Sequence, residues 1–126
     1  MILVRKTDRT AINVYLDEDG VFSLRNGLEM DVFEFHLDSR SLGFKSKVLN
    51  KLKFVLSEND SVKQANGELT LEIDRDDLDY LKFKLDQYFE DLDFIPEELF
   101  TLKNKGNSIY FFLTKIEYLI TTKRDS

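Results

Sequence analysis

Residues 68–93 read ELTLEIDRDDLDYLKFKLDQYFEDLD, and the spacing of their apolar residues changes at Asp74. Before this point Leu69, Leu71 and Ile73 alternate with polar residues, as a half-buried strand requires, because successive side chains point to opposite faces. After it the apolar residues recur at helical spacing and form one arc: Leu78, Leu81, Leu85, Tyr88, Phe89, Leu92 and Ile95. A strand that leads directly into an amphipathic helix predicts an α+β fold.

The carboxylates at the start of this helix have a structural explanation. Asp74 occupies the expected N-cap, and Asp76 and Asp77 lie in the first turn, where the free N–H groups and the helix dipole favour acids. A calcium loop of the EF-hand type requires glycine at its sixth position and glutamate at its twelfth. Counted from Asp74, these positions hold Asp79 and Leu85. We therefore expect capping from these acids and no metal site.

The first third of the chain predicts strands. Four segments have short apolar runs or a period of two: 2–6, 12–16, 21–25 and 28–37. Asn26-Gly27 is the dipeptide that best suits the type I′ turn of a hairpin. A change of parity between Val32 and Phe33 indicates a β-bulge in the last of these strands. We therefore expect an N-terminal antiparallel β-meander of about four strands.

Further along, the period returns to that of a helix. Residues 41–56 predict an amphipathic helix whose outer face carries Lys47, Asn50, Lys51 and Lys53. A polar loop over 57–67 follows, and 96–100 is typical of a first helical turn with proline at its start. The segment 108–122 is ambiguous: its β-branched and aromatic content favours a strand, but its apolar residues form a compact arc only on a helix, which we favour.

The expected architecture is an α+β fold in which the meander and one further strand pack against roughly two to three amphipathic helices. A length of 126 residues fits a single domain spanning 1–126. The absence of linker-like composition agrees with this, and we find no internal repeat. The chain contains no cysteine, which excludes disulfides, thiol nucleophiles and cysteine-ligated metals. No segment approaches the length of a membrane span or of a signal-peptide core, so we expect a cytoplasmic protein without a membrane partner.

Charge is distributed unevenly along the chain. The net charge is −6, which argues against a nucleic-acid partner bound through the whole surface. Residues 39–56 nevertheless contain five lysines and arginines and no acid, whereas residues 68–98 contain twelve acids and three bases. The acidic third of the chain is therefore the first candidate for a charged binding surface.

Motifs for catalysis and cofactor binding are weak. His36 is the only histidine, and Glu34 and Asp38 lie two residues away on the same strand face, where a carboxylate can orient the imidazole. The five glycines never cluster into a phosphate-binding loop, so we expect no cofactor. A carboxylate- and histidine-dependent hydrolase, with or without a metal, remains an alternative function.

Phe54 and Phe83 each fall within an otherwise charged face of a predicted helix. Such aromatic residues, rimmed by charge, are typical of protein interfaces. The predicted partner-binding surface consists of Asp79, Phe83, Asp86, Glu90, Asp91 and Asp93, and a secondary surface consists of Lys47, Lys51 and Phe54. The alternative is that another element covers each phenylalanine.

These features favour a small acidic protein-binding protein. We expect an inhibitor or an immunity protein, antitoxin-like and of bacterial or phage origin, which occludes a basic partner such as a toxin or nuclease by presenting carboxylates in place of phosphates. A single-stranded nucleic-acid binder that uses the basic helix, with Lys45, Lys53 and Phe54, is a third possibility. An exposed phenylalanine is also compatible with a homodimer.

Overall fold

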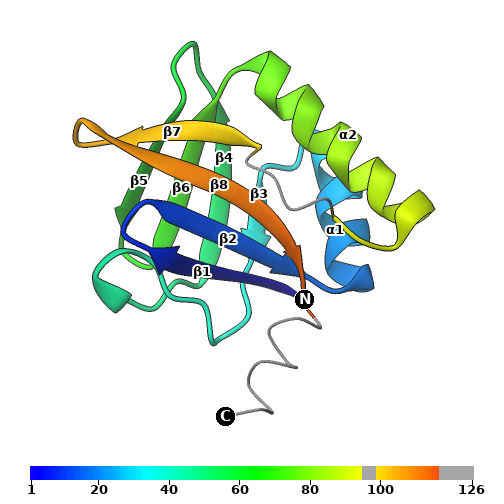
Figure 1. Cartoon of the computed structure of the whole chain (residues 1–126), viewed down its shortest axis with the longest axis horizontal. Coiled ribbons are helices and arrows are strands. Elements are labelled where there is room, and N and C mark those ends of the chain that lie inside the picture. Colours follow the sequence, from blue (N-terminus) through cyan, green and yellow to red (C-terminus); the bar gives the residue numbers. More distant parts are fainter. Residues whose placement is uncertain (95–98, 117–126) are drawn as a thin grey trace.

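A computed structural model describes residues 1–94 and 99–116. Within these residues it contains eight strands and two α-helices (Figure 1). Their bounds are β1 (Ile2–Asp8), β2 (Ala11–Leu16), α1 (Glu18–Glu29), β3 (Glu34–His36), β4 (Lys51–Leu56), β5 (Ser61–Ala65), β6 (Glu68–Ile73), α2 (Arg75–Asp91), β7 (Phe100–Asn104) and β8 (Asn107–Lys115), with a 3₁₀ turn η1 (Phe44–Ser46). Neither helix has the length and apolar character that crossing a membrane would require.

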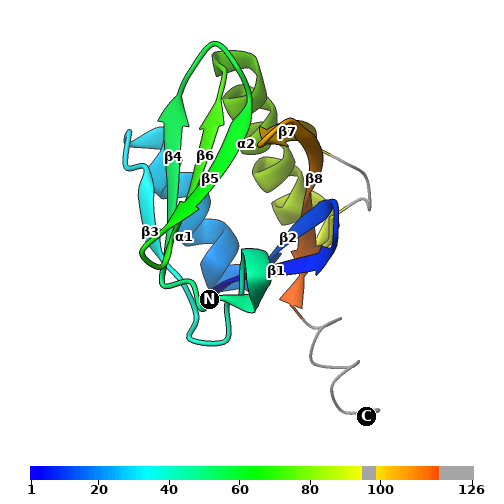
Figure 2. The ribbon, with the colours of Figure 1, turned by 90° about the vertical axis from the view of Figure 1, so that its left-hand side faces the viewer.

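All eight strands belong to one mixed sheet with the order β1-β2-β8-β7-β5-β6-β4-β3, which curls into a nearly closed barrel (Figure 2). The strands form four antiparallel pairs, β1 with β2, β3 with β4, β5 with β6 and β7 with β8. These pairs join one another through parallel pairing of β2 with β8, β4 with β6 and β5 with β7. The segment after β3 connects the two edges of the sheet. There, the Asp38 N–H donates to the Ile2 carbonyl at 2.8 Å and the Leu42 N–H donates to the Val4 carbonyl at 2.9 Å. This closure covers an edge that would otherwise expose unpaired backbone groups.

The topology repeats a β-β-α-β-β unit. Exchanging β1, β2, α1, β3 and β4 with β5, β6, α2, β7 and β8 leaves the order around the barrel unchanged. In each unit an aspartate follows the second strand and caps the helix: Asp17 accepts from the Gly20 N–H at 2.7 Å, and Asp74 accepts from the Asp77 N–H at 2.8 Å. The buried helical positions also correspond: Val21, Leu24 and Leu28 match Leu78, Leu81 and Leu85. The sequence itself shows no internal repeat, and the two units correspond in topology, in their helix caps and in the spacing of their buried helical residues.

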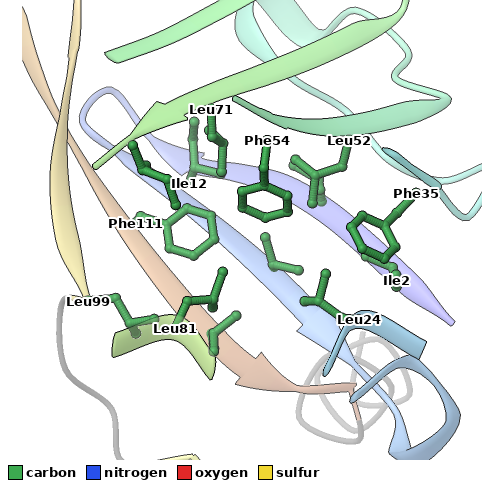
Figure 3. Packing of buried hydrophobic residues seen from close by; sticks show 14 of the residues in the cluster. Ile2, Ile12, Leu24, Phe35, Leu52, Phe54, Leu71, Leu81, Leu99 and Phe111 are labelled. Carbon is green, nitrogen blue, oxygen red and sulfur yellow. The ribbon is translucent and has the colours of Figure 1, made fainter. Parts of the chain in front are cut away.

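The two helices cover one end of the barrel and run antiparallel to each other (Figures 1 and 2). Along their seam Phe22 contacts Phe89 edge to face, with ring centroids 6.2 Å apart, and the Arg25 Nε lies 2.6 Å from an Asp86 oxygen. Side chains from helices and strands share one apolar cluster inside the barrel (Figure 3). The helices therefore close the core at this end.

The first helix cap offers a test of this fold. Replacing Asp17 with alanine removes the side-chain acceptor of the Gly20 N–H, and we expect the free energy of unfolding to fall by about 1 kcal/mol. Urea unfolding measures this loss. Asp19→Ala is the matched control, because Asp19 lies in the first turn but is exposed and does not cap. Equal losses in the two variants would contradict the assignment of the cap.

The predicted architecture, a four-stranded meander on two to three helices, is wrong. Residues 21–25 lie inside α1, because the Asp17 cap and the i, i+3 and i+7 spacing of Val21, Leu24 and Leu28 bury one helix face. Only Glu34–His36 of the segment 28–37 is a strand, so the bulged strand does not form.

Two predicted helices are also strands. In 41–56, only η1 is helical, and β4 places Leu52 and Phe54 inward with a period of two. In 108–122, β8 occupies the segment up to Lys115, and residues from 117 onward lie outside the described residues. The predicted loop 57–67 contains β5, and the predicted helical turn at 96–100 has only its last two residues described, with Phe100 opening β7. The strands predicted at 2–6, 12–16 and 68–73 and the helix after Asp74 are confirmed.

Candidate functional site

The outer face of α2 presents a phenylalanine among carboxylates. At about 100° per residue, Asp79, Asp86 and Glu90 lie within about 60° of Phe83 around the helix axis. All four side chains are exposed, and Phe83 is 53% exposed. Tyr80 stacks beside Phe83 with ring centroids 6.3 Å apart, which holds the exposed ring against the helix. We call Asp79, Phe83, Asp86 and Glu90 the acidic helical surface.

Some of the predicted partner-binding acids have other roles. Asp86 forms an ion pair with Arg25, and its hydrogen bond raises the pKa of that guanidinium. Asp91 is exposed but is turned about 80° from Phe83 around the helix. Asp93 lies beyond the helix end, where its carboxylate accepts from the Phe94 N–H at 2.8 Å. Four of the six predicted residues therefore share one face.

Sequence reasoning missed a second exposed aromatic pair. Phe22 on α1 is 58% exposed and contacts Phe89 on α2, which is 41% exposed. The pair lies along the seam of the two helices and adds apolar area next to the acidic helical surface. Phe22 lies outside the buried positions of α1, so a correct helix assignment for residues 18–29 would have indicated its exposure.

The predicted secondary surface does not form. Phe54 is 3% exposed and packs edge to face on Phe35 in the interior of the barrel, with ring centroids 6.1 Å apart (Figure 3). The reason is that residues 51–56 are a central strand rather than a surface helix. Lys51 pairs with Glu34 at 3.8 Å, and Lys47 lies elsewhere, at the mouth of the barrel.

His36 and its neighbouring carboxylates do not converge on a pocket. Glu34 and His36 are exposed on β3, where Glu34 lies 3.8 Å from the ammonium groups of Lys51 and Lys53. Asp38 lies 2.8 Å from Arg40, whose hydrogen bond lowers the pKa of that carboxyl. A groove of about 1470 Å³ opens at the end of the barrel opposite the helices, and none of Glu34, His36 and Asp38 lines it. This arrangement lends the hydrolase hypothesis no support.

Three carboxylates gather where β6 leads into α2. Asp60, from the loop between β4 and β5, joins Asp74 and Asp77, and one oxygen of each lies within 4.8 Å of the others. Burial and the neighbouring Asp60 carboxylate raise the pKa of Asp77 to about 7. A proton shared between Asp77 and Asp60 relieves the repulsion between their charges. The sequence did not indicate this cluster because Asp60 comes from a separate loop.

A basic groove opens at the end of the barrel opposite the helices. Its volume is about 1470 Å³, and the turns that form it lie on the left in Figure 1 and face the viewer in Figure 2. Within residues 1–94 and 99–116, seven cationic residues and no acidic residue line it: Lys6, Arg9, Lys45, Lys47, Lys63, Lys103 and Lys105. The molecule therefore has an acidic helical end and a basic open end.

Specific backbone features create this groove. β5 and β7 pair only at Ser61 and Lys103, so the sheet opens between them, and the Asn104 side-chain amide bridges the gap by donating to the Val62 carbonyl at 2.9 Å. On the other side of the groove, the Gln64 side chain forms two hydrogen bonds with η1. Its amide oxygen accepts from the Phe44 N–H at 2.7 Å, and its amide nitrogen donates to the Phe44 carbonyl at 3.1 Å. The groove wall is thus held by side chains as well as by the sheet.

Comparisons with protein-family models, with curated proteins and with solved structures return no match. Inference about function therefore rests on the chemistry of the two surfaces. One is a convex acidic face with exposed rings, and the other is a concave basic groove.

Proposed function

We propose that this protein binds a basic partner protein through the acidic helical surface and thereby blocks it, as an inhibitor or an immunity protein does. The observation that carries the proposal is Phe83, which is 53% exposed in the middle of three carboxylates. Interface anchors are typically aromatic side chains surrounded by a polar rim. The charged rim suits a partner whose own binding site attracts phosphates, such as a nuclease or a toxin that acts on nucleic acid.

The rings and the carboxylates contribute differently to such binding. Covering an exposed phenylalanine contributes about 1.5–3 kcal/mol, so burial of Phe83 supplies the largest single part of the affinity. Exposed ion pairs contribute less than about 1 kcal/mol each. Their main effect is on the association rate, because a protein of net charge −6 attracts a cationic partner over a distance set by ionic strength.

The test captures partners from source-cell lysate at low salt with the wild type and with Phe83→Ser. Because Phe83 is exposed, we expect the variant to keep its fold and to lose at least about tenfold in affinity for the captured partner. Val48→Ser is the matched control, since Val48 is 62% exposed and lines the basic groove at the other end of the molecule. This control removes an exposed apolar side chain, and we expect it to leave the affinity for the captured partner unchanged.

The identity of the partner matters as much as its recovery. The proposal requires a basic protein whose retention falls as salt rises and whose activity the wild type inhibits more strongly than Phe83→Ser does. A partner that is retained equally by both variants, or that is acidic, would show that this surface has a different role.

A further inference from the structure

The groove at the barrel mouth concentrates positive charge in an acidic protein. Acids outnumber lysines and arginines by 24 to 18 in the chain, yet among the described residues the groove lining contains seven of the cations and none of the acids. Lys63 pairs with Glu72 at 3.1 Å, but no described carboxylate forms a salt bridge with the other six. A concave surface of one charge sign raises the local concentration of oppositely charged ligands. The groove therefore suits an anion.

The size of the groove and the spread of its cations indicate an extended anion. A volume of about 1470 Å³ exceeds the about 300–1000 Å³ of small-molecule pockets. The cations also come from separate segments: the β1–β2 hairpin, the turn around η1, β5, and the β7–β8 hairpin. Sites for a single phosphate gather their donors on one loop or helix end. Cations distributed around a mouth match charges repeated along a chain.

Aromatic and amide groups in the same lining distinguish between polyanions. Phe44 on η1 and Tyr110 on β8 line the groove, and Tyr110 is 37% exposed. Asn66 and Asn107 offer side-chain amides from two hairpin turns. Flat rings stack with nucleobases, and amides hydrogen-bond to base edges. Polyphosphate has neither flat rings nor base edges, and an acidic peptide carries few groups of this kind.

The groove cations are held toward the opening by tight turns. Lys45 has φ 58° within η1, and Lys105 has φ 49° next to Gly106 in the β7–β8 turn. Positive φ angles place these residues at the tips of their turns, where the side chains are exposed. Lys6 lies over the Phe44 ring, 5.9 Å from its centroid, so this wall combines a cation with an aromatic face.

From these observations we infer that the groove binds single-stranded nucleic acid, with its lysines and Arg9 contacting phosphates and with Tyr110 stacking on bases. The net negative charge of the protein does not oppose this binding, because α2, which carries many of the acidic residues, lies at the other end of the molecule (Figure 1). The inference concerns a different surface from the proposed partner-binding face and is independent of it.

The test measures fluorescence anisotropy of labelled single-stranded RNA and DNA of about 12 nucleotides, within the site sizes of such grooves, at low salt. The groove variant combines Arg9→Gln, Lys45→Gln and Lys105→Gln. The control variant combines Lys51→Gln, Lys53→Gln and Arg75→Gln, which removes equal charge outside the groove. For the groove variant we expect affinity to fall about tenfold or more and the slope of log K against log salt to fall by about 2, whereas the control variant keeps both.

Two variants of Tyr110 test base stacking separately from charge. Tyr110→Ala is expected to weaken oligonucleotide binding about fivefold or more, whereas Tyr110→Phe, which keeps the ring, retains it. Inorganic polyphosphate as competitor measures the charge contribution alone, and Tyr110→Ala should leave its affinity unchanged. The RNA and DNA arms show which nucleic acid is preferred, and thermal unfolding confirms that each variant folds.

Three results would overturn the inference. The first is absence of oligonucleotide binding by the folded wild type even at low salt. The second is equal or tighter binding of duplex DNA or polyphosphate, which would make the ligand a different polyanion. The third is an equal loss in the control variant, which would place the binding outside the groove. Phe83→Ser should bind oligonucleotides like the wild type, so failure of either proposal leaves the other standing.

Discussion

Replacing Phe54 with alanine should lower the free energy of unfolding by about 3–5 kcal/mol, the usual cost of truncating a buried phenylalanine. Phe54 is 3% exposed on a strand that pairs with β6 on one side and β3 on the other, and its ring contacts Phe35. The loss combines the transfer of apolar surface to water with the cavity left in a closely packed interior. Urea unfolding followed by circular dichroism measures it.

Phe83→Ala is the matched control, because it removes the same side chain from an exposed position. We expect a change within about 1 kcal/mol, mainly from the lost contact with Tyr80. Comparable losses at the two positions would mean that Phe83 is covered in solution, and this would also remove the support for the partner-binding surface. A small effect at Phe54 would contradict the barrel interior.

Replacing Asp77 with asparagine should raise the free energy of unfolding at pH 8 by about 1–2 kcal/mol, after allowance for partial solvent exposure. The folded chain holds a proton on Asp77 up to its pKa of about 7, whereas the unfolded chain releases it near the ordinary value of 3.8. The native state thus binds more protons between these values, and stability falls as pH rises through this window. Asparagine carries no charge next to Asp60 and removes the fall.

The test compares urea unfolding of the wild type and Asp77→Asn from pH 4 to pH 8. The two curves should approach each other toward pH 4, where the folded wild type keeps the Asp77 proton and the unfolded chain begins to regain it near 3.8. Asp76→Asn is the control, since Asp76 is exposed in the same helical turn, lies outside the cluster of Asp60, Asp74 and Asp77, and contributes least to the raised pKa of Asp77, so we expect only a small gain. A gain that is independent of pH, or one that Asp76→Asn reproduces, would contradict a shared proton.

The two Asn-Gly dipeptides show why local turn signals are insufficient. Asn66-Gly67 forms the turn of the β5–β6 hairpin, with both residues at positive φ, but we assigned this segment to a loop. Asn26-Gly27, which we expected to be a hairpin turn, lies inside α1. The Asp17 cap and the burial of Leu24 and Leu28 stabilise the helix there more than the turn preference of one dipeptide opposes it.

The sequence predicted the positions of the acidic and basic surfaces only in part. The acidic segment predicted the exposed carboxylates of α2, because a helix cap and an apolar arc define that face locally. The basic run over 39–56 contributes Lys45 and Lys47 to the groove, but Lys51 and Lys53 point to ion pairs on the sheet instead. The remaining groove cations come from hairpins far apart in the chain, so no window of sequence contains them.

The sequence alone determined β1, β2, β6 and the capped helix α2, since each is specified by apolar spacing and end signals within a short stretch. It also placed Phe83 on the outer face of that helix. Only the tertiary structure decided that β4 and β8 are strands: β4 takes hydrogen-bond partners in β6, and β8 in β2, about a hundred residues away. The tertiary structure also decided the groove, because its cations become neighbours only when distant hairpins meet at one end of the barrel.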